Sequence, residues 1–89
     1  MSQKLEGYVK SAELTPDKKG IIIKLLNEKK EVISIKSTIE DDWLKIPEGK
    51  NAEEELKKTC CLLTGYRYVN GQKIPIPNFK MKKITIIKE

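Results

Sequence analysis

The sequence contains no histidine and only two cysteines among its 89 residues. Histidine is the side chain that most often acts as a base near neutral pH and most often binds transition metals. Two cysteines without histidine do not make a zinc site, and no glycine-rich loop is present to cradle a phosphate group. The adjacent Asp41 and Asp42 fall in the first turn of a predicted helix, where acidic residues are ordinary stabilisers. We therefore expect a protein that is not an enzyme and that uses no metal or cofactor.

Long apolar runs are also missing, since none approaches the roughly 20 residues that a membrane-spanning helix needs. Residues 1–6 lack the apolar segment of a signal peptide. The cysteines, Cys60 and Cys61, are adjacent, and neighbours in a strand point to opposite faces, so a disulfide between them is not expected. These features predict a cytoplasmic protein without membrane contact, whose cysteines are small buried apolar residues in a reducing compartment.

The chain is rich in charge and poor in aromatic residues. Charged residues make up 35%, hydrophobic residues 38% and aromatic residues 6% of the sequence. A chain of 89 residues has room for one hydrophobic core, so residues 1–89 are predicted to form a single domain. This core is expected to be small and to lie beneath a strongly ionised surface.

The net charge of +5 is unevenly distributed along the chain. Residues 1–56 hold 10 lysines against 12 acidic residues, whereas residues 57–89 hold 8 Lys or Arg against one Glu. A basic segment attracts polyanions, because each neutralised phosphate releases condensed counterions. The C-terminal third therefore indicates a nucleic-acid partner, although a charged surface that serves solubility or life at high temperature is the alternative.

Three strands are predicted in the first part of the chain. Their residues alternate between apolar and polar or form short apolar runs. Gly7 lies inside the first of them, and a glycine there is typical of a sharp bend or of close backbone approach. The predicted strands are residues 5–14, 21–26 and 31–37, joined by a proline-containing turn at residues 15–20 and a polar hairpin loop at residues 27–30.

Two short helical segments are predicted next. Thr38 and Asp41 resemble a capping box before residues 39–45, in which Ile39 and Trp43 are spaced to face the core together. We favour a core or barrel-plugging position for Trp43, and base stacking is the alternative. Residues 52–58 are predicted as the second helix, with Asn51 as its N-cap, glutamates in its first turn, lysines in its last turn and Leu56 as its anchor.

Residues 59–69 are rich in β-branched, aromatic and cysteine residues, which predicts one long strand with Tyr66 and Tyr68 on the same face. The Asn-Gly pair at 70–71 is a strong hairpin signal. Residues 72–78 contain two prolines and are expected to form an extended arm or loop rather than a central strand. The isoleucines of this arm suit docking or dimerisation, or they simply cover the end of a barrel.

The last predicted strand covers residues 79–88. Its apolar face changes parity between Met81 and Ile84, which predicts a β-bulge near Lys82 and Lys83. The chain therefore has three strands, a helical insertion and two further strands.

This order resembles the OB-fold of single-stranded nucleic-acid-binding proteins such as the replication protein A family, a five-stranded Greek-key barrel. The resemblance includes the glycines Gly7 and Gly65 inside the first and fourth strands. It implies an all-β fold with a short helical insertion. The residues that carry it are Leu5-x-Gly7-x-Val9, Ile23-x-Leu25, Val32-Ile-x-Ile35 and residues 56–65.

OB-folds often bind oligonucleotides on their second and third strands and on the flanking loops. This chain has no aromatic residue on those two strands, so the available rings lie elsewhere. Solvated lysines on edge strands are the alternative for Lys24 and Lys36. By position and charge, the predicted nucleic-acid-binding residues are Lys18, Lys19, Lys24, Lys36, Tyr66, Arg67, Tyr68, Lys73, Lys80 and Lys82.

The sequence thus predicts a non-enzymatic domain that binds single-stranded DNA or RNA, with DNA favoured. The alternative is a protein-interaction or dimerisation subunit of a replication or repair assembly, in which the arm at residues 74–77 makes the contact. A basic SH3-like barrel that binds duplex DNA is a further competitor. The helical insertion favours the OB-fold over that barrel.

Overall fold

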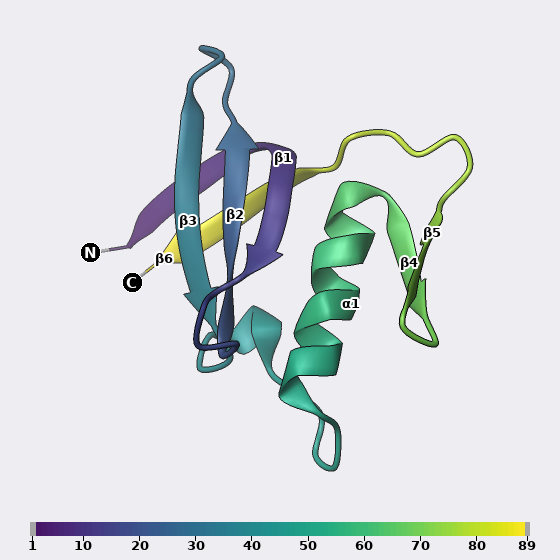
Figure 1. Ribbon diagram of the computed structural model, residues 1–89. Coiled ribbons are helices and arrows are strands. Elements are labelled where there is room, and N and C mark those ends of the chain that lie inside the picture. Colours follow the sequence, from purple (N-terminus) through teal and green to yellow (C-terminus); the bar gives the residue numbers. More distant parts are fainter. Residues whose placement is uncertain (1, 89) are drawn as a thin grey trace.

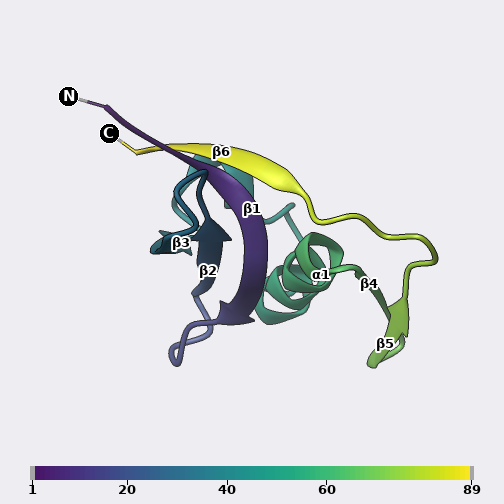
Figure 2. The ribbon, with the colours of Figure 1, turned by 90° about the horizontal axis from the view of Figure 1, so that it is seen from above.

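The computed structural model describes residues 2–88, which form a mostly β fold with one α-helix (Figure 1). Four antiparallel strands make a curled sheet, a half-barrel, in the order β3-β2-β1-β6 (Figure 2). A separate hairpin pairs β4 with β5. The elements are β1 (Gln3–Leu14), β2 (Gly20–Leu26), β3 (Val32–Thr38), the 3₁₀ turn η1 (Asp42–Leu44), α1 (Ala52–Thr64), β4 (Tyr66–Val69), β5 (Gln72–Pro75) and β6 (Lys83–Lys88).

The curl of the sheet comes from β1, which pairs with β6 through its first half and with β2 through its second half. The register with β2 shifts between Val9 and Ser11, and a β-bulge of this kind bends a strand. Gly7 lies just before this bend, where an added Cβ would approach the Leu26 carbonyl oxygen to 2.8 Å. The close backbone approach predicted for Gly7 is confirmed.

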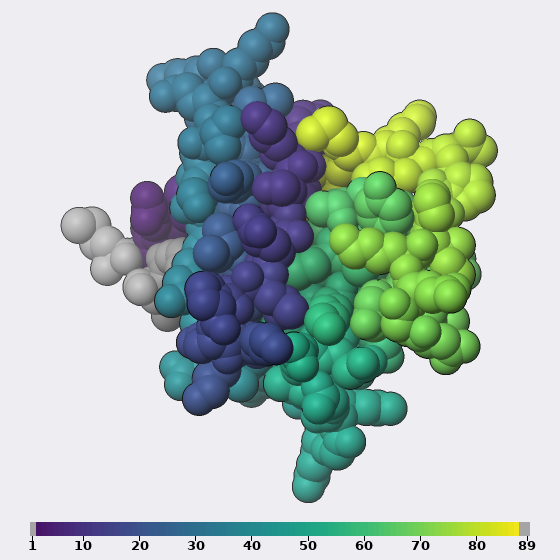
Figure 3. Space-filling model, viewed as in Figure 1, coloured from purple at the N-terminus to yellow at the C-terminus, as the bar shows by residue number. Residues whose placement is uncertain are grey.

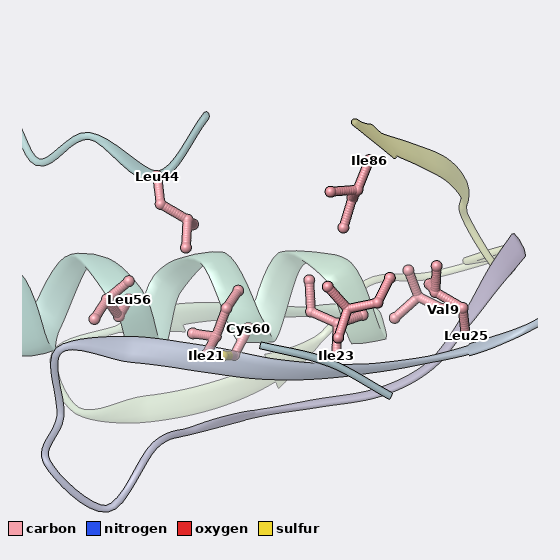
Figure 4. Close-up of a cluster of buried hydrophobic side chains, with 9 residues drawn as sticks. Val9, Ile21, Ile23, Leu25, Leu44, Leu56, Cys60 and Ile86 are labelled. Carbon is pink, nitrogen blue, oxygen red and sulfur yellow. The ribbon is translucent and has the colours of Figure 1, made fainter. Parts of the chain in front are cut away.

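The core lies between the inner face of the sheet and α1 (Figure 4). Ile21, Ile23 and Leu25 alternate along β2 and are completely buried. Leu56 points from α1 into the same cluster and is also completely buried. The sheet supplies one apolar face and the helix one apolar stripe, so each covers the other.

The predicted three-stranded meander and its two loops are confirmed. The resemblance implies five strands, whereas residues 2–88 form six strands in two sheets. The additional strand is β5, because residues 72–75 pair with β4 instead of forming an unpaired arm or loop. Pro75 is tolerated there because β5 is an edge strand.

The prediction of one long strand over residues 59–69 is wrong for its first half. Residues 59–64 continue α1, and only residues 66–69 form a strand. Leu56, Cys60 and Leu63 lie at helical spacing and pack together against the sheet. Gly65 adopts φ 96° as the left-handed C-cap of α1, so it ends a helix instead of bending a strand.

The end of the chain is partly as predicted. Asn70 and Gly71 have φ of 50° and 78°, so the hairpin turn is confirmed. The last strand begins at Lys83 rather than at residue 79. Its register with β1 is regular from Lys83 to Lys88, so the predicted β-bulge near Lys82 and Lys83 is wrong. Residues 76–82 cross from the hairpin to β6 as a connection without regular secondary structure, with a turn at residues 77–78.

The short helical segment after β3 places its side chains differently from the prediction. The Thr38 amide donates to the Asp41 carboxylate at 2.9 Å, as in a capping interaction. The segment then forms a 3₁₀ turn, in which Leu44 is buried and Trp43 is 44% exposed. The predicted core position for Trp43 is therefore wrong, since the tighter turn directs Leu44 inward in its place.

Both cysteines are buried and free, as expected, although they lie on α1 rather than on a strand. Burial, reinforced by the neighbouring Cys61, raises the pKa of the Cys60 thiol from its ordinary value of 9.0 to about 11. The thiolate is the reactive form of cysteine. The folded protein therefore presents Cys60 as an inert thiol near neutral pH.

We expect Cys60 in the folded protein to resist iodoacetamide at pH 8 and to react rapidly once urea unfolds the chain. Mass mapping of alkylated peptides measures this. The raised pKa means that the folded state favours the protonated thiol of Cys60. The contribution of Cys60 to the free energy of unfolding is therefore complete below about pH 9 and is lost as the pH rises towards 11. Equal alkylation rates in the presence and absence of urea would contradict the buried position.

Candidate nucleic-acid interface

The predicted binding residues fall into two groups on different sides of the molecule. Lys18 and Lys19 lie in the loop between β1 and β2, and Lys24 and Lys36 lie on β2 and β3. The other six residues lie in and after the β4–β5 hairpin. In both ribbon views α1 and β1 separate this hairpin from β2 and β3 (Figures 1 and 2). The predicted residues therefore do not converge on one surface.

The outer face of the sheet carries mixed charge. Lys24 and Lys36 are exposed there, and Lys24 is paired in register with Ser11 on β1 and Ser34 on β3. Glu13 shares this outward face, opposite Ile22 on β2. A carboxylate thus accompanies the two lysines on the face on which OB-folds often bind oligonucleotides.

The loop before β2 is also partly neutralised by carboxylates of the chain. Lys18 Nζ lies 3.0 Å from Glu53 Oε1, and this contact lowers the pKa of Glu53. Hydrogen bonds from the Thr15 hydroxyl and the Lys19 amide, with the charges of Lys36 and Lys19, lower the pKa of Asp17. This loop offers a polyanion less positive charge than its lysine content indicates.

Residues 57–82, which we call the basic lobe, differ from this mixed surface in containing no Asp or Glu. They comprise the second part of α1, the β4–β5 hairpin and the connection to β6. Figure 3 shows the hairpin and the connection, coloured green to yellow, as one continuous surface on one side of the molecule. The cations of the basic lobe are Lys57, Lys58, Arg67, Lys73, Lys80 and Lys82.

The basic lobe is held together at the end of α1. The Ile76 amide donates to the Gly65 carbonyl at 2.9 Å, which attaches the connection to the helix C-cap. The Phe79 ring lies against Gly65, where an added Cβ would come within 2.7 Å of it. The Val9 amide donates to the Lys82 carbonyl at 2.9 Å and attaches the other end of the connection to β1.

The hairpin places rings and cations together. The register pairs Tyr68 with Lys73 and Tyr66 with Pro75, so both tyrosines and Lys73 share one face. Lys73 Nζ lies 5.7 Å from the centroid of the Tyr66 ring, within reach of a cation–π interaction. Tyr66 is 36% exposed and Tyr68 is half-buried, so neither ring is closed off beneath the helix.

Arg67 lies on the other face of the hairpin, paired in register with the exposed Ile74. Within residues 2–88, Arg67, Lys80 and Lys82 form no salt bridge. These three cations are therefore available to phosphate groups without competition from a carboxylate of the described residues.

Tyr8 and Trp43 are exposed rings outside the predicted set, and Tyr8 has a lysine beside it. Tyr8 on β1 is 46% exposed, and Lys83 Nζ lies 6.0 Å from its ring centroid. Lys83 is also 3.2 Å from Glu6, a contact that raises the pKa of Lys83 and lowers that of Glu6. Alternation along β1 already directs Tyr8 outward, but its lysine partner comes from the far end of the chain.

The described part of the chain was also compared with the requirements of a metal site and of a membrane-spanning helix. Residues 2–88 contain no group of three or more His, Cys, Asp or Glu side chains arranged to hold a metal ion. No helix among them has the length and apolar character to cross a bilayer. Comparison with known proteins found no matching family model, curated protein or solved structure.

Proposed function

We propose that this protein binds single-stranded nucleic acid, DNA in the first place, through the basic lobe. The observation that carries the proposal is the complete absence of carboxylates from residues 57–82, which hold six Lys or Arg and two partly exposed tyrosines. Phosphate contacts of such a surface release counterions and supply sequence-independent affinity. The mixed outer face of the sheet has no comparable charge.

The rings favour a single strand over a duplex. Bases of a single strand are free to stack on aromatic side chains, and each stack contributes roughly 1–3 kcal/mol. Tyr66 and Tyr68 lie beside each other on one face of the hairpin, with Lys73 next to them. A strand that passes over this face would place bases on the tyrosines and phosphates near Lys73, and Arg67 would meet a phosphate where the strand crosses the edge of the hairpin.

We also propose that the half-barrel is a variant of the OB-fold. A curled antiparallel sheet and one helix are compatible with a small barrel of this kind. The binding surface, however, differs from the one that the resemblance implies, since the β4–β5 hairpin and its connection take over the role of the second and third strands. Lys18, Lys19, Lys24 and Lys36 then have a supporting electrostatic role at most.

Salt titration of binding to a fluorescein-labelled oligothymidylate tests the proposal. With four phosphates contacted, log K should fall with log[salt] with a slope of about −3, so affinity drops about 50-fold between roughly 50 and 200 mM salt. Fluorescence anisotropy measures this. Absence of binding at low salt, or affinity that is independent of salt, contradicts the proposal.

Charge-removing variants locate the surface. We expect Arg67→Gln and Lys82→Gln each to weaken oligonucleotide binding about threefold to tenfold and to reduce the salt slope by about 0.7. The matched variants Lys24→Gln and Lys36→Gln remove the same charge from the sheet and should change affinity less than twofold. The reverse order of effects would move the site to the outer face of the sheet.

Self-association is a second candidate function, favoured by one observation. Ile74 is 46% exposed on β5, the edge strand of the hairpin, and an exposed apolar residue on an edge invites pairing with another chain. Ile76 is half-buried and its amide is bound to Gly65, so only part of the predicted arm at residues 74–77 is open. A monodisperse monomer in sedimentation velocity would remove this candidate.

A further inference from the structure

A groove of about 740 Å³ lies between β6 and the segment that follows β3, and among the described residues that line it only Leu63 belongs to the basic lobe. The groove is within the size range of roughly 300–1,000 Å³ typical of ligand sites. Its lining residues are Glu40, Asp41, Asp42, Trp43, Leu63, Ile84, Thr85, Ile86 and Ile87.

One wall of the groove is a free strand edge. Within residues 2–88, β6 pairs only with β1. The Val9 amide donates to the Lys82 carbonyl, so Val9 and Lys82 are a hydrogen-bonded pair of the β1–β6 ladder. In an antiparallel ladder every second residue pair is hydrogen-bonded, so the backbone groups of Ile84 and Ile86 also face β1. The backbone N–H and C=O groups of Thr85 and Ile87 consequently point away from β1, into the groove.

The rest of the groove combines apolar surface with negative charge. Ile86 is buried, Leu63 packs on the core, and the indole of Trp43 is 44% exposed. Among the described residues that line the groove three are acidic and none is basic, in a chain whose net charge is +5. Asp42 is also 3.8 Å from Lys45, but both side chains are exposed, and a pair of this kind contributes little.

We propose that this groove binds an extended segment of a partner protein, with alternating basic and apolar residues, as an additional strand on β6. The strand edge supplies main-chain hydrogen bonds, and the apolar floor accepts every second side chain. The carboxylates of Glu40, Asp41 and Asp42 attract the lysines or arginines between them. Nucleic acid is repelled by the same carboxylates, so the groove and the basic lobe select different ligands.

A short peptide of alternating lysine and valine, acetylated and amidated at its ends, serves as the probe. Trp43 is the only tryptophan of the chain and lines the groove, so its emission reports occupancy directly. We expect saturable binding with a shift of the emission to shorter wavelength, and affinity that falls with salt. The same peptide with glutamate in place of lysine should bind at least tenfold more weakly.

Backbone methylation of the peptide tests the strand pairing. N-methylation of one set of alternate residues removes the N–H groups that face β6, and should weaken binding at least tenfold. Methylation of the other set leaves those groups in place and should change affinity less than threefold. Equal effects of the two sets, or no effect of either, would contradict strand addition.

Variants of the protein address the same hydrogen bonds. Thr85→Pro removes an N–H that points away from β1, and an edge strand tolerates proline at such a position. The substitution should weaken binding of the lysine–valine peptide at least tenfold. Thr85→Ala is the matched control and should change its affinity less than twofold. If circular dichroism shows that Thr85→Pro does not fold, the methylated peptides decide the question.

Two results would overturn the proposal. The first is binding of the glutamate peptide as tightly as the lysine peptide, because the acidic wall would then have no role. The second is a dimer in sedimentation velocity that Thr85→Pro dissociates, because a second copy would then occupy the edge. Oligonucleotide binding by Thr85→Pro should remain unchanged, which keeps this test separate from that of the basic lobe.

Discussion

Replacement of Leu56 by alanine is expected to lower the free energy of unfolding by about 2–5 kcal/mol. Leu56 is completely buried and connects α1 to the strands of the half-barrel. Its truncation removes favourable burial and leaves a cavity that the sheet cannot fill. An isolated helix of the length of α1 is marginal in water, so α1 depends on this packing. Urea denaturation followed by far-ultraviolet circular dichroism measures the loss.

Leu62→Ala provides the matched control on the same helix. Leu62 is 49% exposed, so the same atoms are removed from a position that water already reaches. The free energy of unfolding should change by about 0.5 kcal/mol or less. Similar losses for the two variants would mean that helix propensity, rather than packing on the sheet, determines the stability of α1.

The elements that could be predicted from sequence are those with a local cause. Gly7 marks a close backbone approach, Asn51 caps a helix by accepting the Glu54 amide, and Asn70-Gly71 forms a hairpin turn. Each of these depends on the chemistry of one or two residues and not on the rest of the fold. The meander was predictable for the same reason, since alternation and turn residues together define its strands.

Residues 59–64 show why propensity alone failed. Their threonines and cysteines are typical of strands, but intrinsic propensities amount to only about 1 kcal/mol or less per residue. The Thr59 and Thr64 hydroxyls donate to carbonyls one turn back, so they are satisfied inside the helix. Burial of Cys60 beside Leu56 then outweighs the strand preference, and this depends on a sheet formed by distant residues.

The candidate site was predictable in charge but not in position. The basic composition of residues 57–89 is plain in the sequence and includes the lobe. The separation of Lys24 and Lys36 from the hairpin depends on where α1 lies, which only the tertiary structure shows. The groove beside Trp43 could not be predicted, because its other wall is β6, more than 35 residues later in the chain.

The molecule therefore separates its charges spatially. Carboxylates accompany Trp43 at the free edge of β6, whereas residues 57–82 carry cations alone. Exposed charges are screened over roughly a Debye length of 8–10 Å near physiological salt, so the charge of each surface acts mainly on a ligand in contact with it. This arrangement would allow one small domain to hold a nucleic acid and a basic protein segment at the same time.

Gly65→Ala is expected to lower the free energy of unfolding by about 2–5 kcal/mol, through two separate costs. Gly65 has φ 96°, and a residue with a Cβ pays about 1–2 kcal/mol in a left-handed conformation. The added Cβ would also meet the Phe79 ring at 2.7 Å, and overpacking of this kind costs roughly 1–3 kcal/mol. Thermal and urea unfolding measure the sum.

Gly49→Ala separates the two costs, because Gly49 has φ 83° and nothing lies within 4 Å of an added Cβ. It should lose about 1–2 kcal/mol. In the Phe79→Ala background, Gly65→Ala should lose only this backbone cost, so the double-mutant cycle should give a coupling of about 1–3 kcal/mol. A coupling near zero would mean that the ring does not rest on Gly65.

The same position connects stability to the proposed function. The Gly65 carbonyl accepts the Ile76 amide, so a shift of the helix C-cap moves the connection that carries Lys80 and Lys82. Gly65→Ala should therefore weaken oligonucleotide binding even where the protein remains folded, whereas Gly49→Ala should leave it unchanged. Loss of affinity in both variants would assign the effect to general destabilisation. Loss in Gly65→Ala alone would mean that the end of α1 sets the geometry of the basic lobe.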